Sequence, residues 1–393
     1  MKYSILRVLF IFGMALFPLG VADSGDKQSK QVRLVKTPNG GIQPQALVDS
    51  KGTLHLIYFK GDPAAGDLFY VRRVAKEARF SAPIRVNSQA GSAIAVGTIR
   101  GGRLALGKNN RVHVAWNGSG KAAPKGPGRG TPMLYTRLND AGTAFEPQRN
   151  LMNLGEFLDG GGTVTADQAG NVIVAWQAKK IDGPAGEDKR LVYVALSSDE
   201  GKTFAKEKPA FDKVTGACAC CGMHAFTDTK GNVHLIYRAA TKDNNRDMWL
   251  LRSSDRGKSF QGSMIHPWSI ESCPMSSQAF AEGIDGIYTA WDTKGQIYFN
   301  TIRPGKRSLM DPSPAPGDAN GRKHPTLAIN NKGDLLLAWT EGTGWQRGGA
   351  LGWQLFDALL RPLSERGRAA DAIPVWGLPS AVANADGSFT IFH

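Results

Sequence analysis

The chain has 393 residues, of which 41% are apolar and 21% charged, and this composition supplies a large core and excludes wholesale disorder. With 47 glycines but only 4 cysteines, it is neither collagen-like nor held together mainly by disulfides. Lysine and arginine outnumber aspartate and glutamate by 48 to 34, so the net charge is +14. That charge favours anionic partners such as acidic glycans, nucleic acid or anionic membrane surfaces, and a basic exported protein without such a partner is the alternative.

The first segment is typical of a targeting sequence. Lys2 and Arg7 precede an apolar run at residues 8–17, and small residues follow. This pattern predicts a secretory signal peptide over residues 1–22, cleaved at its end, with residues 23–393 forming one mature domain. The run is short for a membrane anchor, and no later stretch approaches the ~18 apolar residues of a spanning helix. We therefore expect an exported protein, periplasmic or extracellular, without a transmembrane segment after processing.

An internal repeat organises the rest of the chain. Each copy has a small polar turn followed by four to six apolar residues, and it ends in an aromatic residue or, in the last copy, a histidine. The final residues of the seven copies are Tyr58, Trp116, Trp176, Tyr237, Trp291, Trp339 and His393. A period of roughly 50–60 residues that is rich in β-branched and aromatic residues indicates repeated β-sheet units. No long 3.6-residue apolar period follows residue 30, which excludes an α-helical solenoid.

Every unit repeats one order of predicted strands. In the first unit, a strand at 45–48 enters an Asp-x-x-Gly turn, the aromatic-ending strand follows, and a third at 68–71 and a short fourth at 83–86 complete it. Four antiparallel strands repeated radially form a β-propeller. A row of independent β-domains is the alternative, but about 55 residues per unit is small for a domain.

Two connections between predicted third and fourth strands carry a recognisable motif, Ser-x-Asp-x-Gly-x-(Thr/Ser)-Phe. Its defining residues are Asp199, Gly201 and Phe204 in one copy and Asp255, Gly257 and Phe260 in the other. The motif resembles the Asp-box (BNR) repeat of sialidase-like propellers. In such a turn the aspartate accepts amide hydrogen bonds, the glycine takes the strained position and the aromatic ring packs between strands. The resemblance implies a fold rather than an activity.

The sequence is compatible with two blade numbers, six and seven. The resemblance to sialidases implies six blades, whereas the repeat count is seven. The seventh unit, residues 380–393, lacks its outer strands, and residues 31–36 read as a lone outer strand at the other end of the chain. Joining these segments would close a seventh blade from both chain ends. The expected fold is therefore all-β, a propeller of six or seven four-stranded blades, with seven favoured.

The connections separate two faces of such a propeller. The Asp-x-x-Gly turns and Asp boxes share one, here called the turn face. The opposite, loop-rich face carries long loops with many glycines and charges, at residues 60–67, 117–132, 177–190, 238–247 and 340–350. Loops on a rigid scaffold commonly bind ligands, and Lys121, Lys125 and Arg129 suit an anionic small molecule or glycan, although a solvated loop has the same composition. Nucleic acid is not expected, because export removes it as a partner.

All four cysteines precede predicted first strands of neighbouring units. Cys218, Cys220 and Cys221 precede one, and Cys273 precedes the next. Because first strands line the central channel, we expect the four residues to meet at its mouth on the loop-rich face. Disulfides are the default in an exported protein, but any complete pairing requires a strained bridge within the triplet. One bridge to Cys273 would leave two free thiols.

Those thiols have further sulfur and nitrogen ligands nearby in the sequence. Thiolates and thioethers favour soft metals such as Cu(I), so a copper or redox site is the alternative to structural disulfides, and inert thiols are a third interpretation. The candidate metal ligands are Cys218, Cys220, Cys221, Cys273, Met223, His224 and Met275. No cofactor follows with certainty from the sequence.

The resemblance also implies a set of catalytic residues to look for. Sialidases use three arginines for the substrate carboxylate, a tyrosine nucleophile with a glutamate, and an acid, an exception to the usual pair of carboxylates. An Arg-Ile-Pro segment before the first unit is missing. The candidates that could reach the loop-rich face are Arg100, Arg238, Arg322 and Glu341. Their spacing does not assemble a triad, so whether the protein is an enzyme, of exo-α-sialidase type, stays open.

Three hypotheses follow from the sequence. The leading one is an exported sialidase-like propeller that binds an anionic ligand, a glycan in particular, on its loop-rich face without efficient sialidase turnover. The alternatives are an active glycoside hydrolase and a periplasmic soft-metal or redox protein that uses the cysteine cluster.

Overall fold

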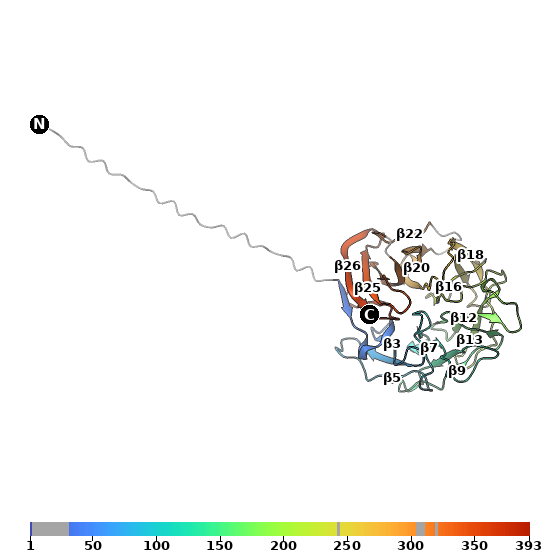
Figure 1. Cartoon of the computed structure of the whole chain (residues 1–393). Helices are drawn as coiled ribbons and strands as arrows, with labels where there is room; N and C mark the ends of the chain where they lie inside the picture. Colours follow the sequence, from blue (N-terminus) through green and yellow to red (C-terminus); the bar gives the residue numbers. More distant parts are fainter. Residues whose placement is uncertain (2–30, 242–243, 304–310, 319–320) are drawn as a thin grey trace. The chain divides into compact units, whose positions relative to one another are not determined.

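The computed structural model describes residue 1 and residues 31–393 apart from 242–243, 304–310 and 319–320 (Figure 1). The expected signal peptide, residues 1–22, lies outside the described residues. The described chain is almost entirely β-structure, arranged as seven sheets around a central axis. Its short 3-10 helices are η1 (Pro38–Gly40), η2 (Lys108–Asn110) and η3 (Glu187–Lys189). In the part of the chain that is described, no helix is long and apolar enough to cross a membrane.

Six of the sheets are built on four antiparallel strands in sequence order, and one of these six has a fifth strand. Blade 1 consists of β2 (Ile42–Val48), β3 (Leu54–Lys60), β4 (Asp67–Arg73) and β5 (Ile84–Arg85). Blade 2 consists of β6 (Arg103–Leu106), β7 (Val112–Asn117), β8 (Met133–Arg137) and β9 (Arg149–Asn150). Blade 3 consists of β11 (Thr163–Ala166), β12 (Val172–Lys180), β13 (Leu191–Ser197) and β14 (Lys208–Pro209), and β10 (Gly155–Glu156) pairs with the end of β12.

The next three blades repeat the same order. Blade 4 consists of β15 (Met223–Thr227), β16 (Val233–Arg238), β17 (Met248–Ser253) and β18 (Gln261–His266). Blade 5 consists of β19 (Gln278–Gly283), β20 (Gly286–Thr293), β21 (Gln296–Ile302) and β22 (Ser313–Pro314). Blade 6 consists of β23 (Arg322–Ile329), β24 (Leu335–Glu341), β25 (Gly349–Phe356) and β26 (Pro362–Ile373).

The seventh sheet takes strands from distant parts of the sequence. It contains β27 (Ser380–Ala383), β28 (Phe389–Phe392) and β1 (Val32–Val35), three strands among the described residues. β1 lies parallel to β28, with Val32 opposite Phe389. The seven sheets confirm the prediction of seven blades over the alternative of six.

The repeating aromatic residue explains how the blades pack. The innermost strands contact one another in the order β2, β6, β11, β15, β19, β23 and β27, and β27 contacts β2. The second strand of a blade is enclosed by neighbours on both faces, so every residue of β7 and of β20 is buried. Trp116, Trp176 and Trp291 are each at most 1% exposed. The core is therefore a set of apolar layers between neighbouring blades, and in blades 1–6 the aromatic residue near the end of the second strand fills them.

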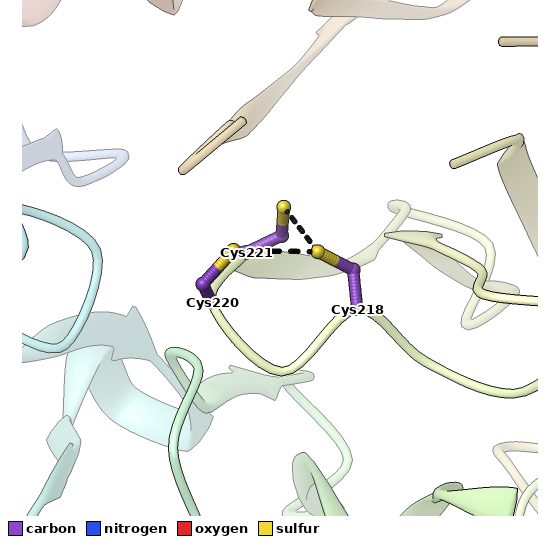
Figure 2. Close-up of side chains that lie close together, drawn as sticks. All are labelled: Cys218, Cys220 and Cys221. Carbon is purple, nitrogen blue, oxygen red and sulfur yellow. Dashed lines mark hydrogen bonds between the residues drawn. The ribbon is translucent and has the colours of Figure 1, made fainter. Parts of the chain in front are cut away.

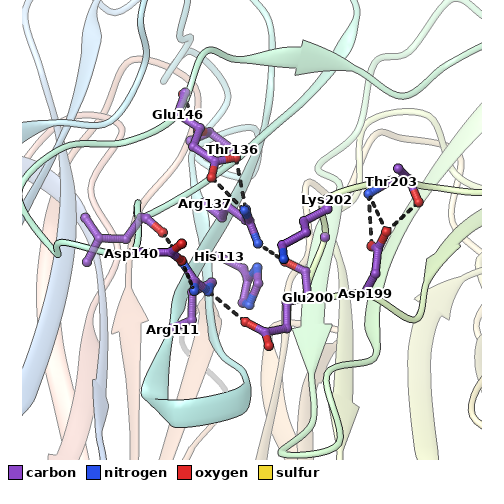
Figure 3. Close-up of polar contacts among 12 residues, drawn as sticks. Arg111, His113, Thr136, Arg137, Asp140, Glu146, Asp199, Glu200, Lys202 and Thr203 are labelled. Atoms are coloured by element: carbon purple, nitrogen blue, oxygen red, sulfur yellow. Dashed lines mark hydrogen bonds and ion pairs between the residues drawn. The ribbon is translucent and has the colours of Figure 1, made fainter.

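The first Asp-box segment forms a tight turn that ties two blades together (Figure 3). Asp199 Oδ1 accepts a hydrogen bond from the Thr203 backbone N–H at 2.9 Å. Gly201 has φ +74°, and a Cβ there would collide with the Tyr135 hydroxyl of blade 2, so only glycine fits. Phe204 packs edge-on against the same Tyr135 ring, with centroids 4.8 Å apart. The Glu200 N–H donates to the Gly170 carbonyl at 2.9 Å, which places the box beside an Asp-x-x-Gly turn on the turn face.

The second Asp-box segment has the same geometry. Asp255 Oδ1 accepts from the Ser259 N–H at 2.9 Å, Gly257 has φ +82°, and Phe260 packs against the apolar layer between blades 3 and 4.

Candidate functional site at the loop-rich face

The cysteine segments meet where two neighbouring blades begin. Residues 218–221 enter β15, and Cys273 lies shortly before β19. Cys220 and Cys273 form a disulfide whose Cα atoms are 6.3 Å apart, which confirms the expectation that Cys273 meets the triplet. Cys218 and Cys221 are free thiols, 1% and 2% exposed. The structure thus adopts the pairing that avoids a bridge within the triplet.

The two free thiols lie next to each other and next to Cys220, one of the two cysteines of the disulfide (Figure 2). The Sγ atoms of Cys218 and Cys221 are 2.9 Å apart, and Cys218 Sγ is 3.5 Å from Cys220 Sγ. The Cys221 N–H donates to the Cys218 carbonyl at 3.3 Å, so a turn brings the two ends of this Cys-x-x-Cys segment together. Among the described residues these three cysteines form the cluster that could hold a metal ion, with their sulfur atoms within 4.8 Å of one another.

The surroundings of the thiol pair favour one thiolate and one thiol. Burial raises the pKa of Cys221, but the hydrogen bond from Cys218, the positive charge of Arg238 and the Ser276 hydroxyl outweigh it, and the pKa lies below its ordinary value. The pKa of Cys218 is raised, first by its hydrogen bond to Cys221 and then by burial. When the pair loses a proton, the negative charge therefore forms on Cys221 rather than on Cys218.

Arg238, a candidate for substrate binding, lies beneath this pair. It is 1% exposed and stacks on Trp268, with its guanidinium carbon 4.6 Å from the ring centroid. Its Nε donates to Ser276 Oγ at 2.7 Å, and Ser276 Oγ lies 3.5 Å from Cys221 Sγ. Its Nη1 donates to the Arg246 carbonyl at 2.5 Å. The guanidinium thus supports the thiol pair from the protein interior.

The other catalytic candidates have partners of their own and do not converge with Arg238. Arg100 forms an ion pair with Asp159 and donates from Nη1 to the Val96 carbonyl at 2.8 Å. Arg322 Nε lies 3.4 Å from Glu341 Oε1, which joins these two candidates in blade 6. Burial raises the pKa of Glu341, but the hydrogen bonds from the Trp339 indole and from Arg368 lower it by more. The net pKa lies below its ordinary value, so this carboxylate stays ionised.

The remaining proposed metal ligands are dispersed around the cluster. Met223 is buried at the start of β15, and Met275 is half-buried before β19. His224 Nδ1 donates to the Gln278 carbonyl at 3.0 Å, and its ring lies on the wall of the central channel. The structure therefore brings the four cysteines together, whereas His224 is hydrogen-bonded to Gln278 instead.

An exposed aromatic residue on the loop-rich face belongs to no motif in the sequence. Trp345, in the loop between β24 and β25, is 56% exposed and packs edge-on against Trp376 at 4.8 Å. A Cβ at Gly97 would collide with Arg100 and lie 3.7 Å from the Trp345 ring, so both side chains flank this glycine. The signal that could have identified it is a single tryptophan in a glycine-rich loop, Gly342-Thr-Gly-Trp.

The basic loop of blade 2 is at the surface, as the sequence suggests. Lys121, Lys125 and Arg129 are exposed, and Lys125 Nζ donates to the Gly120 carbonyl at 2.7 Å.

Comparison with solved structures relates this fold to glycan-degrading propellers. The chain is similar to NanB sialidase from Streptococcus pneumoniae at 10% identity and a TM-score of 0.53, covering 87% of this chain and 81% of that one. It is similar to the Hadza microbial sialidase Hz136 at 11% identity and a TM-score of 0.51, covering 77% of this chain. The alpha-L-arabinanase of Penicillium chrysogenum matches at 13% identity and a TM-score of 0.50, covering 81% of this chain and 94% of that one.

These similarities establish a sialidase-like propeller fold. The chain spans 64% of the length of the Hadza sialidase. No protein-family model matches the chain, and no curated protein matches it.

Proposed function

We propose that this protein is an exported thiol–disulfide protein whose reactive centre is the Cys218/Cys221 pair. The observation that carries the proposal is the 2.9 Å separation of two buried free sulfurs beside the Cys220–Cys273 disulfide. A thiolate is the nucleophile in disulfide exchange, and Arg238 and Ser276 stabilise one on Cys221. Because Cys273 is exposed whereas the pair is buried, the disulfide is the part of the centre that an external thiol can reach.

Exchange within the centre needs no external oxidant. Cys218 passes its proton to the Cys221 thiolate and attacks Cys220 Sγ, 3.5 Å away, and the Cys220–Cys273 bond breaks with Cys273 leaving as a thiolate. Cys221 then loses its proton and attacks Cys218 Sγ, which releases Cys220. The Cys218/Cys221 pair is oxidised, Cys220 and Cys273 gain the two electrons, and the single proton that the pair carried passes to one of these two leaving thiolates. The centre would thus move a disulfide between the surface and the interior.

Redox titration with mapping of the disulfides tests this function. The mature protein is equilibrated in glutathione buffers of graded poise, quenched with acid, alkylated and analysed by mass spectrometry. We expect a Cys218–Cys221 bridge at some poise, and a Cys221→Ser variant should accumulate the Cys218–Cys220 bridge instead. If the Cys218–Cys221 bridge forms under no condition, the proposal fails.

Binding of a soft metal by Cys218 and Cys221 would replace thiol–disulfide exchange as the function of this pair. Two thiolates suit Cu(I), so metal analysis of anaerobically purified protein accompanies the mapping. Stoichiometric copper that is lost in Cys218→Ser and Cys221→Ser would assign the pair to metal binding instead of exchange.

Binding of an anionic glycan on the loop-rich face is the second candidate function, and Trp345 is the observation that favours it. An exposed tryptophan beside the Arg100–Asp159 ion pair offers an apolar platform with polar groups at its edge, and the lysines of blade 2 add positive charge. The fold that this chain shares with sialidases and an arabinanase is consistent with a glycan ligand. Because Arg238 and Arg322 are engaged by the protein, we propose binding without efficient sialidase turnover.

Glycan binding is tested separately from thiol chemistry. A panel of sialylated and neutral glycans is screened with wild type, Trp345→Ala and, as a control, Ile284→Ala, which changes a residue 90% exposed after β19. We expect Trp345→Ala alone to lose binding. Turnover of a fluorogenic sialoside that disappears in Arg238→Ala or Arg322→Ala would contradict the absence of catalysis.

A further inference from the structure

Two cavities follow each other along the propeller axis. A chamber of about 40 Å³ lies at the start of the innermost strands, and a larger cavity of about 510 Å³ extends from there to the turn face. Both are lined by Gln45, His224, Ala279, Thr326 and Ser380. Shared walls make the two cavities consecutive sections of one axial channel.

The chamber contains an arginine whose charge the protein does not balance. Arg103, the first residue of β6, is 8% exposed and donates one hydrogen bond, from Nη1 to Gln45 Oε1 at 3.2 Å. Among the described residues, no carboxylate forms an ion pair with it, and the chamber lining includes no acid. Burial alone lowers the pKa of Arg103 to about 10, which still leaves it charged at neutral pH. A buried charge without a partner is costly, so the chamber favours an anion.

An unpaired amide lies in the same wall. Gln278, the first residue of β19, is 2% exposed, and neither its side-chain nitrogen nor its oxygen has a hydrogen-bond partner among the described residues. Leaving both atoms unpaired is unfavourable, and a ligand that accepts from the amide N–H would relieve it. A planar carboxylate matches the guanidinium fork and can also accept from an amide.

The larger section of the channel has a different character. Its apolar lining residues include Leu104, Leu106, Val164, Phe226, Phe280 and Leu327, and Asp49 and Glu282 also line this section. Its volume lies within the range of about 300–1,000 Å³ that is usual for small-molecule sites, which are mostly apolar with a few placed polar groups. The channel therefore combines one anion-binding end with an apolar body.

We propose that the axial channel binds a small amphiphilic carboxylate, with its head group at Arg103 and Gln278 and its apolar chain directed toward the turn face. Gly222, which follows the cysteine cluster, lies beside the guanidinium: a Cβ on it would lie 3.7 Å from Arg103 Nη2. The larger section reaches residues of the turn face, Asp49, Ser50 and Thr229, so the proposed entrance lies there. This site uses none of the cysteines and none of the loop-rich face, so it stands independently of the proposed function.

A series of straight-chain acids tests the site with the wild-type protein. Isothermal titration with formate, butanoate, hexanoate and octanoate is expected to show affinity rising roughly fourfold per buried methylene, since each contributes about 0.8 kcal/mol. The neutral analogue 1-octanol is expected to bind at least tenfold more weakly than octanoate. The proposal is overturned if octanoate does not bind at millimolar concentration, if formate binds as tightly, or if octanol equals octanoate.

Variants locate the head group. Arg103→Met is expected to lose at least tenfold in octanoate affinity without changing octanol binding, whereas Arg366→Met, which removes an exposed arginine on β26, is expected to change neither. Octanoate affinity unchanged in a folded Arg103→Met protein would contradict the assignment. If that variant fails to fold, the wild-type series still decides the question.

Discussion

Arg238 donates a hydrogen bond from Nε to Oγ of Ser276 at 2.7 Å. Because the serine oxygen accepts this bond, its own proton remains free to point at Cys221 Sγ, 3.5 Å away. A buried positive charge and a hydroxyl in series therefore stabilise negative charge on the sulfur. Both residues enter the site from elements other than the cysteine segment itself, Arg238 from the end of β16 and Ser276 from the approach to β19.

Removing this hydroxyl is expected to raise the pKa of Cys221. In Ser276→Ala the sulfur loses a hydrogen bond and Arg238 loses its link to it, so the thiolate is less stable. Thiolate formation, followed by its ultraviolet absorbance as pH increases, should shift to higher pH than in wild type. Ser272→Ala removes an exposed hydroxyl nearby and should leave the titration unchanged. An unaltered curve in Ser276→Ala would show that the serine does not act on Cys221.

Breaking the disulfide is expected to lower stability and release a thiol. Cys273→Ser opens a loop of 53 residues, and such bridges contribute about 2–4 kcal/mol to the free energy of unfolding. Denaturant unfolding measures the loss, and a thiol count under denaturing conditions should rise from two to three. A count of one would mean that Cys220 pairs with Cys218 or Cys221 instead.

The Asp-box carboxylates are expected to make stability depend on acidity. Burial raises the pKa of Asp199, but hydrogen bonds from Thr203 and Ser197 lower it to about 2, against an ordinary value of 3.8. A pKa depressed in the folded state contributes stability that is present above pH 3.8 and is lost as the pH falls toward 2. Asp199→Asn should therefore reduce the melting temperature at pH 6, and the difference from wild type should shrink toward pH 2. Asp212→Asn, an exposed control, should show no such pH dependence.

The glycine of the first Asp box can be compared with a glycine in open space. Gly201 and Gly231 both have positive φ, +74° and +82°, but only at Gly201 would a Cβ meet another side chain, the Tyr135 hydroxyl. Both alanine substitutions incur backbone strain of about 1 kcal/mol, and Gly201→Ala adds overpacking of roughly 1–3 kcal/mol. Equal losses of unfolding free energy in the two variants would show that the Tyr135 side chain moves away from the added methyl group at little cost.

The proposed signal peptide predicts where the mature chain begins. Cleavage after Ala22 would give a protein that begins at Asp23, and intact-mass analysis of the secreted material checks this directly. Retention of residues 1–22 in that material would contradict the proposed signal peptide.

The propeller could be predicted from the sequence because packing between blades requires the same kind of residue at the same position of each repeat. The layers between blades need a large aromatic residue at one position, and Trp116, Trp176, Tyr237 and Trp291 mark it at almost regular spacing. The meeting of Cys273 with the triplet followed from the same regularity, since both precede innermost strands.

The details of the site depend on geometry that the repeat does not encode. Ser276 lies among ordinary serines in the sequence, and its role arises from Arg238, a residue on another strand. His224 follows the cysteines closely, yet successive residues of a strand point to opposite sides, and its ring lies on the channel wall. Nothing in the sequence distinguishes Arg103 from the other arginines, because its burial arises only when the seven sheets enclose the channel.

The parallel pairing of β1 with β28 has a consequence for how the chain is made. Val32 leaves the ribosome long before its partner Phe389 exists, and at about 5–20 residues per second the interval is on the order of 20–70 s. Throughout that time the segment 32–35 presents unpaired backbone groups that other strands could capture. The last sheet can assemble only after nearly the whole described chain has been synthesised.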